Sequence, residues 1–361
     1  MWAVIRRDLK SVLRSPLIYV GTILIGVFLY FTLSKYFTLC YVPQDMVFQE
    51  LSYREIIELD ADVAQGYIPA SYTQNGSYQV GMRRLANELQ GYLSLSAEET
   101  KLRMQELDGM SVDEIDSYIE KKYGLLDTKL KFVPKPDDLC LGTPDEINAY
   151  LDQSLQEERY TEYFGRVYCD LLGLMVCFFG IVFLVPFFWE DSRKSIYEIL
   201  HTKPIGAAKY IMGKVAGGVL SLSLVIGVLT VLFGSAATYY GALAGFPVSW
   251  WDCWVAVFLY IMPNVIYMVS MYVGIVMIFK SPIAAFPILT IQLFYSHLGG
   301  IDALAPGGYR VPALAMLIRF PERFFETSVS SQAVMNQALL LIASVIFITI
   351  SMMIWSRRRT S

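Results

Sequence analysis

The chain has 361 residues, of which 55% are hydrophobic, and its mean hydropathy is +0.44. This is more apolar material than a water-soluble domain usually buries, so the composition argues against an ordinary soluble protein. The formal net charge is only −4, and we expect no nucleic-acid partner. The five cysteines and two histidines lack the spacing of metal ligands, so no metal site is expected.

The N-terminal residues 1–16 predict a basic amphipathic helix on the cytoplasmic side of a membrane. Val4, Ile5, Leu9 and Leu13 fall on one side of this helix, and basic residues fall on the other. A long apolar run follows without a small-residue cleavage site, so we interpret it as an uncleaved first span.

Apolar runs of the length needed to cross a bilayer predict six transmembrane helices. The central runs contain no Asp, Glu, Lys or Arg, which argues against a carrier driven by an ion gradient. Pro282 and Pro287 predict a bent or broken entry into the short fifth span. The predicted spans are residues 17–39, 166–189, 215–238, 253–279, 282–298 and 338–356.

Basic residues in the short connections predict the orientation. With six spans, the N-terminal helix, the loop 190–214, Lys280 and the tail 357–361 all lie on one side, which the positive-inside rule makes cytoplasmic. We therefore expect a multi-pass protein of the cell membrane with both termini in the cytoplasm. The outer segment 299–337 also carries arginines, which weakens the asymmetry without reversing it. Within it, Val311 to Ile318 predicts a short re-entrant or interfacial helix, or a segment packed against an outer domain.

Residues 40–165 have the composition of a separate domain, which we place outside the cell. They hold 24 of the 33 acidic residues, against 11 basic ones. Three capping boxes, beginning at Ser96, Ser111 and Thr143, predict a mostly helical domain. Lys129 to Val133 is the best strand candidate. Cys40 and Cys140 are compatible with a disulfide, although two free thiols are the favoured interpretation.

The loop 190–214 predicts a short amphipathic helix that ends before Pro204. Ile196, Ile199 and Leu200 share one face, and charged residues surround it. This helix lies either against the membrane surface or against another protein. A basic loop of this kind is also what the positive-inside rule alone would produce.

The loop resembles that of the type-2 family of ATP-binding-cassette exporter permeases. After the second span these proteins carry an acidic pair, a helix with a Glu-Leu-Leu-like motif, a proline and then Gly-Lys. The chain has Glu190-Asp191, Glu198-Ile199-Leu200, Pro204-Ile205 and Gly213-Lys214 in that order. It departs from the family where Ser195-Ile196 replaces the usual small Gly-Thr pair.

The resemblance implies an all-α membrane protein with six transmembrane helices and a mostly helical extracellular domain inserted between the first two. It implies that the loop contains a coupling helix, which transmits the closure of an ATPase subunit to the spans. The expected partners are that ATPase, a second permease copy or sister permease, and the lipid bilayer. The residues expected to contact the ATPase are Glu190, Asp191, Arg193, Ile196, Glu198, Ile199, Leu200 and Pro204.

The chain lacks a phosphate-binding loop of the form G-x-x-x-x-G-K-[ST], so we expect it not to be an enzyme by itself. No cofactor is expected in this chain, and ATP and magnesium would bind the partner ATPase. Polar residues remain within the spans, and they either line a substrate path or hydrogen-bond between helices. The path candidates are Asn264, Gln292, Ser223 and Thr230.

These observations favour the permease subunit of an exporter for a peptide, drug or other amphiphile. The alternative is a signalling or mechanotransmitting complex that works its extracellular domain without moving cargo. A membrane enzyme is a third class, but the sequence offers no catalytic residues for it.

Overall fold

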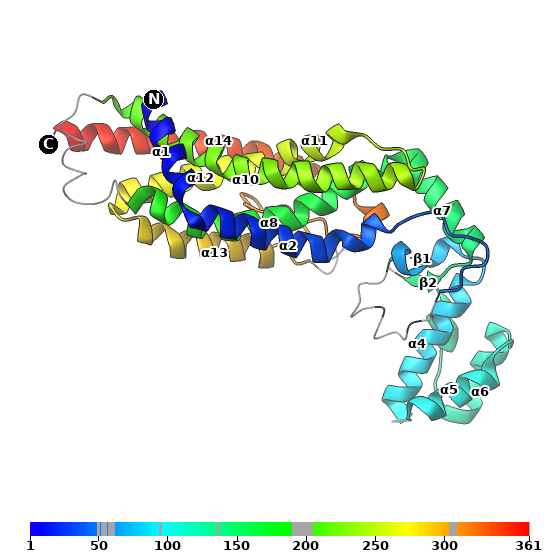
Figure 1. Ribbon diagram of the computed structural model, residues 1–361. Helices are drawn as coiled ribbons and strands as arrows, with labels where there is room; N and C mark the ends of the chain where they lie inside the picture. The colour runs from blue at the N-terminus through cyan, green and yellow to red at the C-terminus, as the bar shows by residue number, and fades with distance from the viewer. Residues whose placement is uncertain are drawn as a thin grey trace. The chain divides into compact units, whose positions relative to one another are not determined.

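The computed structural model divides the chain into two compact units (Figure 1). The helical unit comprises Met1–Phe37 and Arg159–Ser361, and the inserted unit comprises Thr38–Glu158. The structure describes residues 1–48, 51, 56, 62–93, 96–135, 138–189, 205–302 and 309–360.

The helical unit is a bundle in which α2, α8, α10, α12, α13 and α14 run alongside one another (Figure 1). The helix α1 and the C-terminal end of α14 lie at the same end of the bundle. Two 3-10 turns, η4 (Pro282–Ala284) and η6 (Phe324–Glu326), complete the described elements of this unit. The helices are α1 (Trp2–Arg14), α2 (Pro16–Phe37), α8 (Tyr160–Trp189), α10 (Ala207–Leu243), α11 (Trp250–Tyr260), α12 (Met262–Phe279), α13 (Ala285–Leu298) and α14 (Ser331–Thr360).

Five helical stretches in the described residues are long and apolar enough to cross a membrane. The sixth candidate, Pro282–Leu298, is shorter: its 17 residues span only about 26 Å at 1.5 Å per residue, against a hydrocarbon core of about 30 Å. Six spans therefore remain a prediction. The five stretches are Pro16–Phe37, Tyr160–Trp189, Ala207–Leu243, Trp250–Phe279 and Ser331–Arg358.

Two of these helices extend well beyond their apolar runs. The second span, predicted from residue 166, begins at Tyr160, and the third, predicted from residue 215, begins at Ala207. The extension of the third span brings Lys214 into α10, and Asp170 lies within the second span; both side chains are buried. Each charge has an oppositely charged partner, which is what makes its burial tolerable.

The fourth span is interrupted. Helix α11 ends at Tyr260, α12 begins at Met262, and Ile261 lies between them. Pro263 stands at the start of α12, where its missing N–H is least costly.

The short helix expected over Val311–Ile318 is not present. This segment is turn and irregular backbone, Leu314 adopts a φ of 57°, and Ala315 to Ile318 are buried. Side chains replace helical hydrogen bonds: Asn336 on α14 accepts from the Ala315 N–H at 3.1 Å and donates to its carbonyl at 2.8 Å. Ser296 on α13 accepts from the Met316 N–H at 2.9 Å. Tertiary contacts thus satisfy this backbone inside the bundle.

In its described residues, the inserted unit is mostly helical and contains one two-stranded antiparallel sheet. Its core contains Leu85, Leu89, Ile115, Ile119 and Phe132. The helices are α4 (Gly76–Leu93), α5 (Ala97–Leu107), α6 (Val112–Tyr123) and α7 (Pro144–Glu157), the 3-10 turns are η1 (Val63–Gln65), η2 (Ala70–Tyr72) and η3 (Thr128–Phe132), and the strands are β1 (Tyr67–Pro69) and β2 (Leu139–Leu141).

All three predicted capping boxes are confirmed. Ser96, Ser111 and Thr143 each cap a helix, and the glutamate three residues later accepts from the cap backbone N–H. These backbone hydrogen bonds lower the pKa of Glu99 and Glu114, because they favour the charged carboxylates.

The strand predicted over Lys129–Val133 is wrong, because Thr128–Phe132 forms the 3-10 turn η3. The turn begins after Asp127, which has a φ of 58°, and the Lys129 N–H donates to the Asp116 carboxylate at 3.3 Å. In the sheet that does form, Tyr67–Pro69 pairs with Leu139–Leu141 across more than 60 positions of the chain, a pairing that local pattern does not reveal.

Candidate functional site

The predicted coupling helix falls outside the residues that the structure describes. Glu190, Asp191, Arg193, Ile196, Glu198, Ile199, Leu200 and Pro204 all lie in that stretch. The structure does describe both ends of the loop, at Trp189 and Ile205, and the helices that carry them.

A buried lysine joins three helices beside the loop. The Lys214 ammonium lies 3.2 Å from Asp8 Oδ2 on α1, and the Lys214 residue is 1% exposed. The same ammonium lies 4.7 Å from the ring centroid of Phe187 and 5.2 Å from that of Phe188, both at the end of α8. Cation–π attraction of this kind strengthens when water is excluded. We call Asp8, Phe187, Phe188 and Lys214 the Lys214 cluster.

Two glycines allow α1 to approach α10 closely. A Cβ at Gly213 would lie 3.1 Å from a carbon of Val4, and one at Gly217 would lie 3.3 Å from Asp8 Oδ2. On the α1 side, the buried residues are Ile5, Asp8 and Val12. The side of α1 that bears these three residues therefore packs against the protein itself, whereas Leu13, on the predicted apolar side, is 46% exposed.

The carboxyl of Asp8 is tightly held. Arg7 Nη2 donates to Asp8 Oδ1 at 3.1 Å, while Lys214 contacts both oxygens. Burial raises the pKa of this carboxyl, and the Lys214 ammonium and the Arg7 guanidinium oppose the shift.

The beginning of α10 also contacts the end of α14. The rings of Tyr210 and Trp355 stack with centroids 4.0 Å apart, and both residues are 2% exposed. The two helices that bear the loop therefore contact α1 and α14 within a few residues of it. A displacement of the loop can therefore be transmitted through packed side chains to α1, α8, α10 and α14.

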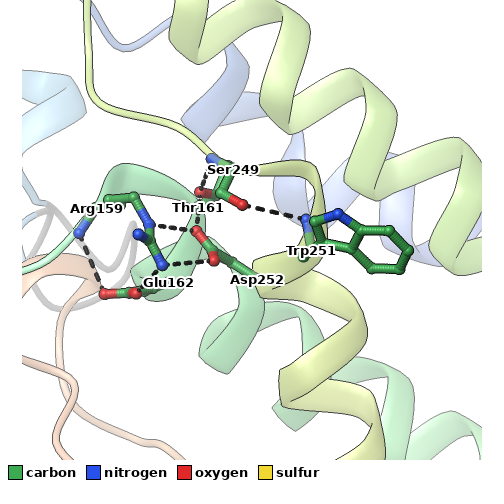
Figure 2. Close-up of polar contacts among 6 residues, drawn as sticks. All are labelled: Arg159, Thr161, Glu162, Ser249, Trp251 and Asp252. Atoms are coloured by element: carbon green, nitrogen blue, oxygen red, sulfur yellow. Dashed lines mark hydrogen bonds and ion pairs between the residues drawn. The ribbon is translucent and has the colours of Figure 1, made fainter.

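A second charged cluster joins the first turn of α8 to the first turn of α11 (Figure 2). Arg159 donates to both oxygens of Asp252, at 2.9 Å and 2.8 Å, and Thr161 donates to Asp252 at 2.5 Å. The Ser249 N–H donates to Thr161 Oγ1 at 2.9 Å. The Ser249 hydroxyl in turn caps α11 by accepting from the Trp251 N–H at 3.4 Å.

We expect Asp252→Ala to lower the free energy of unfolding by about 1–3 kcal/mol, because it leaves the buried Thr161 hydroxyl and part of the Arg159 guanidinium without their acceptor. Glu162→Gln removes the more exposed carboxylate that binds the same arginine, and should cost at most about 1 kcal/mol. Thermal unfolding in detergent would measure both. An Asp252→Ala variant as stable as Glu162→Gln would contradict this assignment.

A third buried ion pair anchors the irregular segment before α14. Arg319 pairs with Asp170 on α8 and lies 3.0 Å from His297 on α13. Farther along α8, Cys177 Sγ donates to the Met316 carbonyl at 3.1 Å. The segment is thus fixed to α8 at two points.

The four predicted path residues each bond a different neighbour. Asn264 donates to the Tyr260 carbonyl at 2.8 Å, and Gln292 donates to the Leu314 carbonyl at 2.8 Å. Ser223 contacts the Met262 sulfur at 3.7 Å, and Thr230 shares a hydrogen bond of 3.1 Å with Tyr168. A role for them in a substrate path remains a prediction.

The sequence interpretation missed the Lys214 cluster. It assigned Lys214 to the basic loop and did not single out Asp8. A signal was present, since Asp8 lies between Ile5 and Val12 on the face of α1 that is buried. A charge on an apolar helical face indicates a buried partner.

These features define an all-α, multi-pass membrane protein whose charged clusters lie toward the helix ends. Residues 2–358 match the model of a family described as "ABC-2 family transporter protein", and the chain belongs to this family. It is accordingly the membrane permease component of an ABC transporter and works with an ABC ATPase subunit. Comparison with curated proteins and with solved structures gave no significant match.

Proposed function

We propose that this chain is the permease subunit of an ATP-driven exporter in the cell membrane and that its loop 190–204 receives the motion of the ATPase. The observation that carries the proposal is the Lys214 cluster, which ties both helices flanking the loop to α1. ATP and magnesium bind the partner ATPase in this proposal.

In the proposed cycle, closure of the ATPase displaces the loop and thereby the ends of α8 and α10. Because Lys214 is buried between aromatic rings and the Asp8 carboxylate, the two helix ends and α1 move together. Packed interfaces of this kind switch between discrete arrangements rather than deform continuously. The movement alternates the pathway between the two sides of the membrane.

We propose a peptide, drug or other amphiphile as cargo, and a second permease copy or sister permease as partner. The apolar character of the spans supports an amphiphilic cargo. The test is ATP-dependent accumulation of such a compound in sealed vesicles that contain the purified complex. ATP hydrolysis without accumulation of any amphiphile would instead favour a signalling complex that works the inserted unit.

We further propose six spans with both termini in the cytoplasm and the inserted unit outside the cell. The cysteines allow a direct test, since Cys40 is an exposed free thiol and the other four free cysteines are buried. Burial also raises the pKa of the Cys140 thiol, which lowers its thiolate fraction and hence its reactivity.

We expect a membrane-impermeant maleimide to label the chain in intact cells at Cys40. The Cys40→Ser variant is the control and should show no labelling until the protein is denatured. Labelling of Cys40 only after permeabilisation would contradict the proposed orientation of the inserted unit.

A further inference from the structure

The break between α11 and α12 exposes a backbone carbonyl that two side-chain amides cover. Asn264 Nδ2 on α12 and Gln337 Nε2 on α14 donate to the Tyr260 carbonyl oxygen at 2.8 Å and 3.1 Å. Two donors from two different helices thus converge on one atom at the interruption of the fourth span.

The oxygens of these two amides have no hydrogen-bond donor among the described residues. Asn264 Oδ1 and Gln337 Oε1 are buried and make no hydrogen bond to the residues that the structure describes. The residues themselves are 3% and 8% exposed. A carbonyl oxygen can only accept a hydrogen bond, so each amide must turn its nitrogen toward the Tyr260 carbonyl. The assignment of the amide oxygens as the atoms without a donor therefore follows from the chemistry of the contact.

Both free oxygens lie near the carbonyl oxygen of Tyr260. An amide nitrogen and oxygen share one carbon, with bonds of about 1.33 Å and 1.23 Å, so both free oxygens lie within about 6 Å of the Tyr260 oxygen. A buried acceptor without a donor costs free energy, and a native structure retains such groups for a reason. The presence of two such oxygens at one helix break indicates a ligand that donates hydrogen bonds.

The surroundings narrow the class of ligand. The free acceptors are neutral amide oxygens, which accept hydrogen bonds from N–H and O–H groups and attract cations but cannot hold an anion. Tyr260, whose carbonyl holds both amides, packs with Val311 against an apolar cluster formed by Ile318, Phe320 and Ala333. The rings of Tyr260 and Phe320 meet edge to face with centroids 5.2 Å apart. Amide oxygens close to apolar side chains can bind an amphiphile, with its head group at the oxygens and its tail against the apolar residues.

We propose that Asn264 and Gln337 form a binding site for the ammonium group of an amphiphilic cargo at the break of the fourth span. In other interrupted membrane helices, backbone carbonyls at the break bind cations; here the side-chain amide oxygens of Asn264 and Gln337 take that place. The inference rests on the proposed transport function and specifies its cargo as a cationic amine with an apolar tail.

The test is binding of dodecylamine to the purified full chain in lipid nanodiscs, without ATP or the ATPase. Dodecanol and dodecanoate are the comparison ligands, since they share the tail and differ only in the head group. We expect the wild-type protein to bind dodecylamine at least tenfold more tightly than dodecanol, and dodecanoate no better than dodecanol. Equal binding of amine and alcohol would overturn the proposal.

Two substitutions with opposite expected effects address the site itself. Gln337→Lys keeps an N–H donor for Tyr260 but removes the free acceptor, and should remove the tenfold preference for the amine. Gln337→Glu retains acceptor oxygens and adds a negative charge, and should increase the preference. Gln332→Lys, on an exposed position of the same helix, is the matched control and should leave binding unchanged. If Gln337→Glu fails to strengthen amine binding, the assignment is wrong.

A sodium ion shares the required chemistry, so a separate titration compares sodium with N-methylglucamine as the only cation. Stabilisation by sodium without any preference for dodecylamine would assign the oxygens to an inorganic ion and overturn the proposal. Because binding is measured without ATP, a preference for the amine that persists when vesicle transport fails would refute only the transport function.

Discussion

Substitution of both Glu198 and Leu200 by Lys is expected to abolish co-purification of the ATPase and, with it, ATP-dependent transport. The two residues lie two positions apart in the predicted amphipathic helix, and Leu200 belongs to its apolar face. Seating this face in a cleft of the ATPase would bury an unpaired ammonium. Such a charge costs about 3–5 kcal/mol, which weakens binding by a factor on the order of 10²–10⁴.

The matched control changes a carboxylate and a leucine to lysine elsewhere in the chain. Glu120 and Leu126 in the inserted unit are both exposed, and Leu126 is 70% exposed. The Glu120→Lys, Leu126→Lys variant should retain the ATPase. If the Glu198→Lys, Leu200→Lys variant also retains it at wild-type yield, the loop is not the docking element.

Replacement of Lys214 alone by Met is expected to lower the free energy of unfolding by about 3–5 kcal/mol, because it removes the buried cation of the Asp8 carboxylate and leaves only the half-exposed Arg7. The combined Asp8→Leu, Lys214→Met variant removes both charges and should recover most of the lost stability. Thermal unfolding in detergent would measure both variants. A combined variant that is less stable than Lys214→Met would contradict a paired charge at this position.

The same combined variant separates stability from transmission. If the Lys214 cluster transmits the loop's motion, the stable double variant should bind the ATPase normally yet transport at least about tenfold more slowly, the equivalent of about 1.4 kcal/mol in the barrier. Arg7→Gln, which removes only the half-exposed partner of Asp8, is the control and should leave transport near the wild-type rate. Normal transport by the double variant would restrict the cluster to a structural role.

Local patterns predicted much of this architecture because they depend on residues close together in the chain. The capping boxes at Ser96, Ser111 and Thr143 each involve a cap and a glutamate three residues apart. The apolar runs likewise predicted the positions of the bundle helices. Both signals are short in sequence and follow directly from backbone geometry.

The errors arose where residues distant in sequence decide the local structure. Lys214 is buried in α10 because Asp8, 206 positions earlier, supplies its counter-charge. The segment around Ala315 is irregular because Asn336 and Ser296 satisfy its backbone groups, which leaves it no need of a helix. Hydropathy reports length and polarity but not such pairings.

The site at the helix break illustrates the same limit. The sequence marked Asn264 as a polar residue beside Pro263 but gave no reason to associate it with Gln337. Only the common contact with the Tyr260 carbonyl brings the two amides together.

An ATPase can drive this permease only if the loop 190–204 faces the cytoplasm. A Ser195→Cys variant in a Cys40→Ser background can be labelled with an impermeant maleimide to determine the side on which the loop lies. We expect no labelling in intact cells and full labelling after permeabilisation. Labelling of the introduced thiol in intact cells would contradict this orientation, because no cytoplasmic ATPase could then drive this permease through that loop.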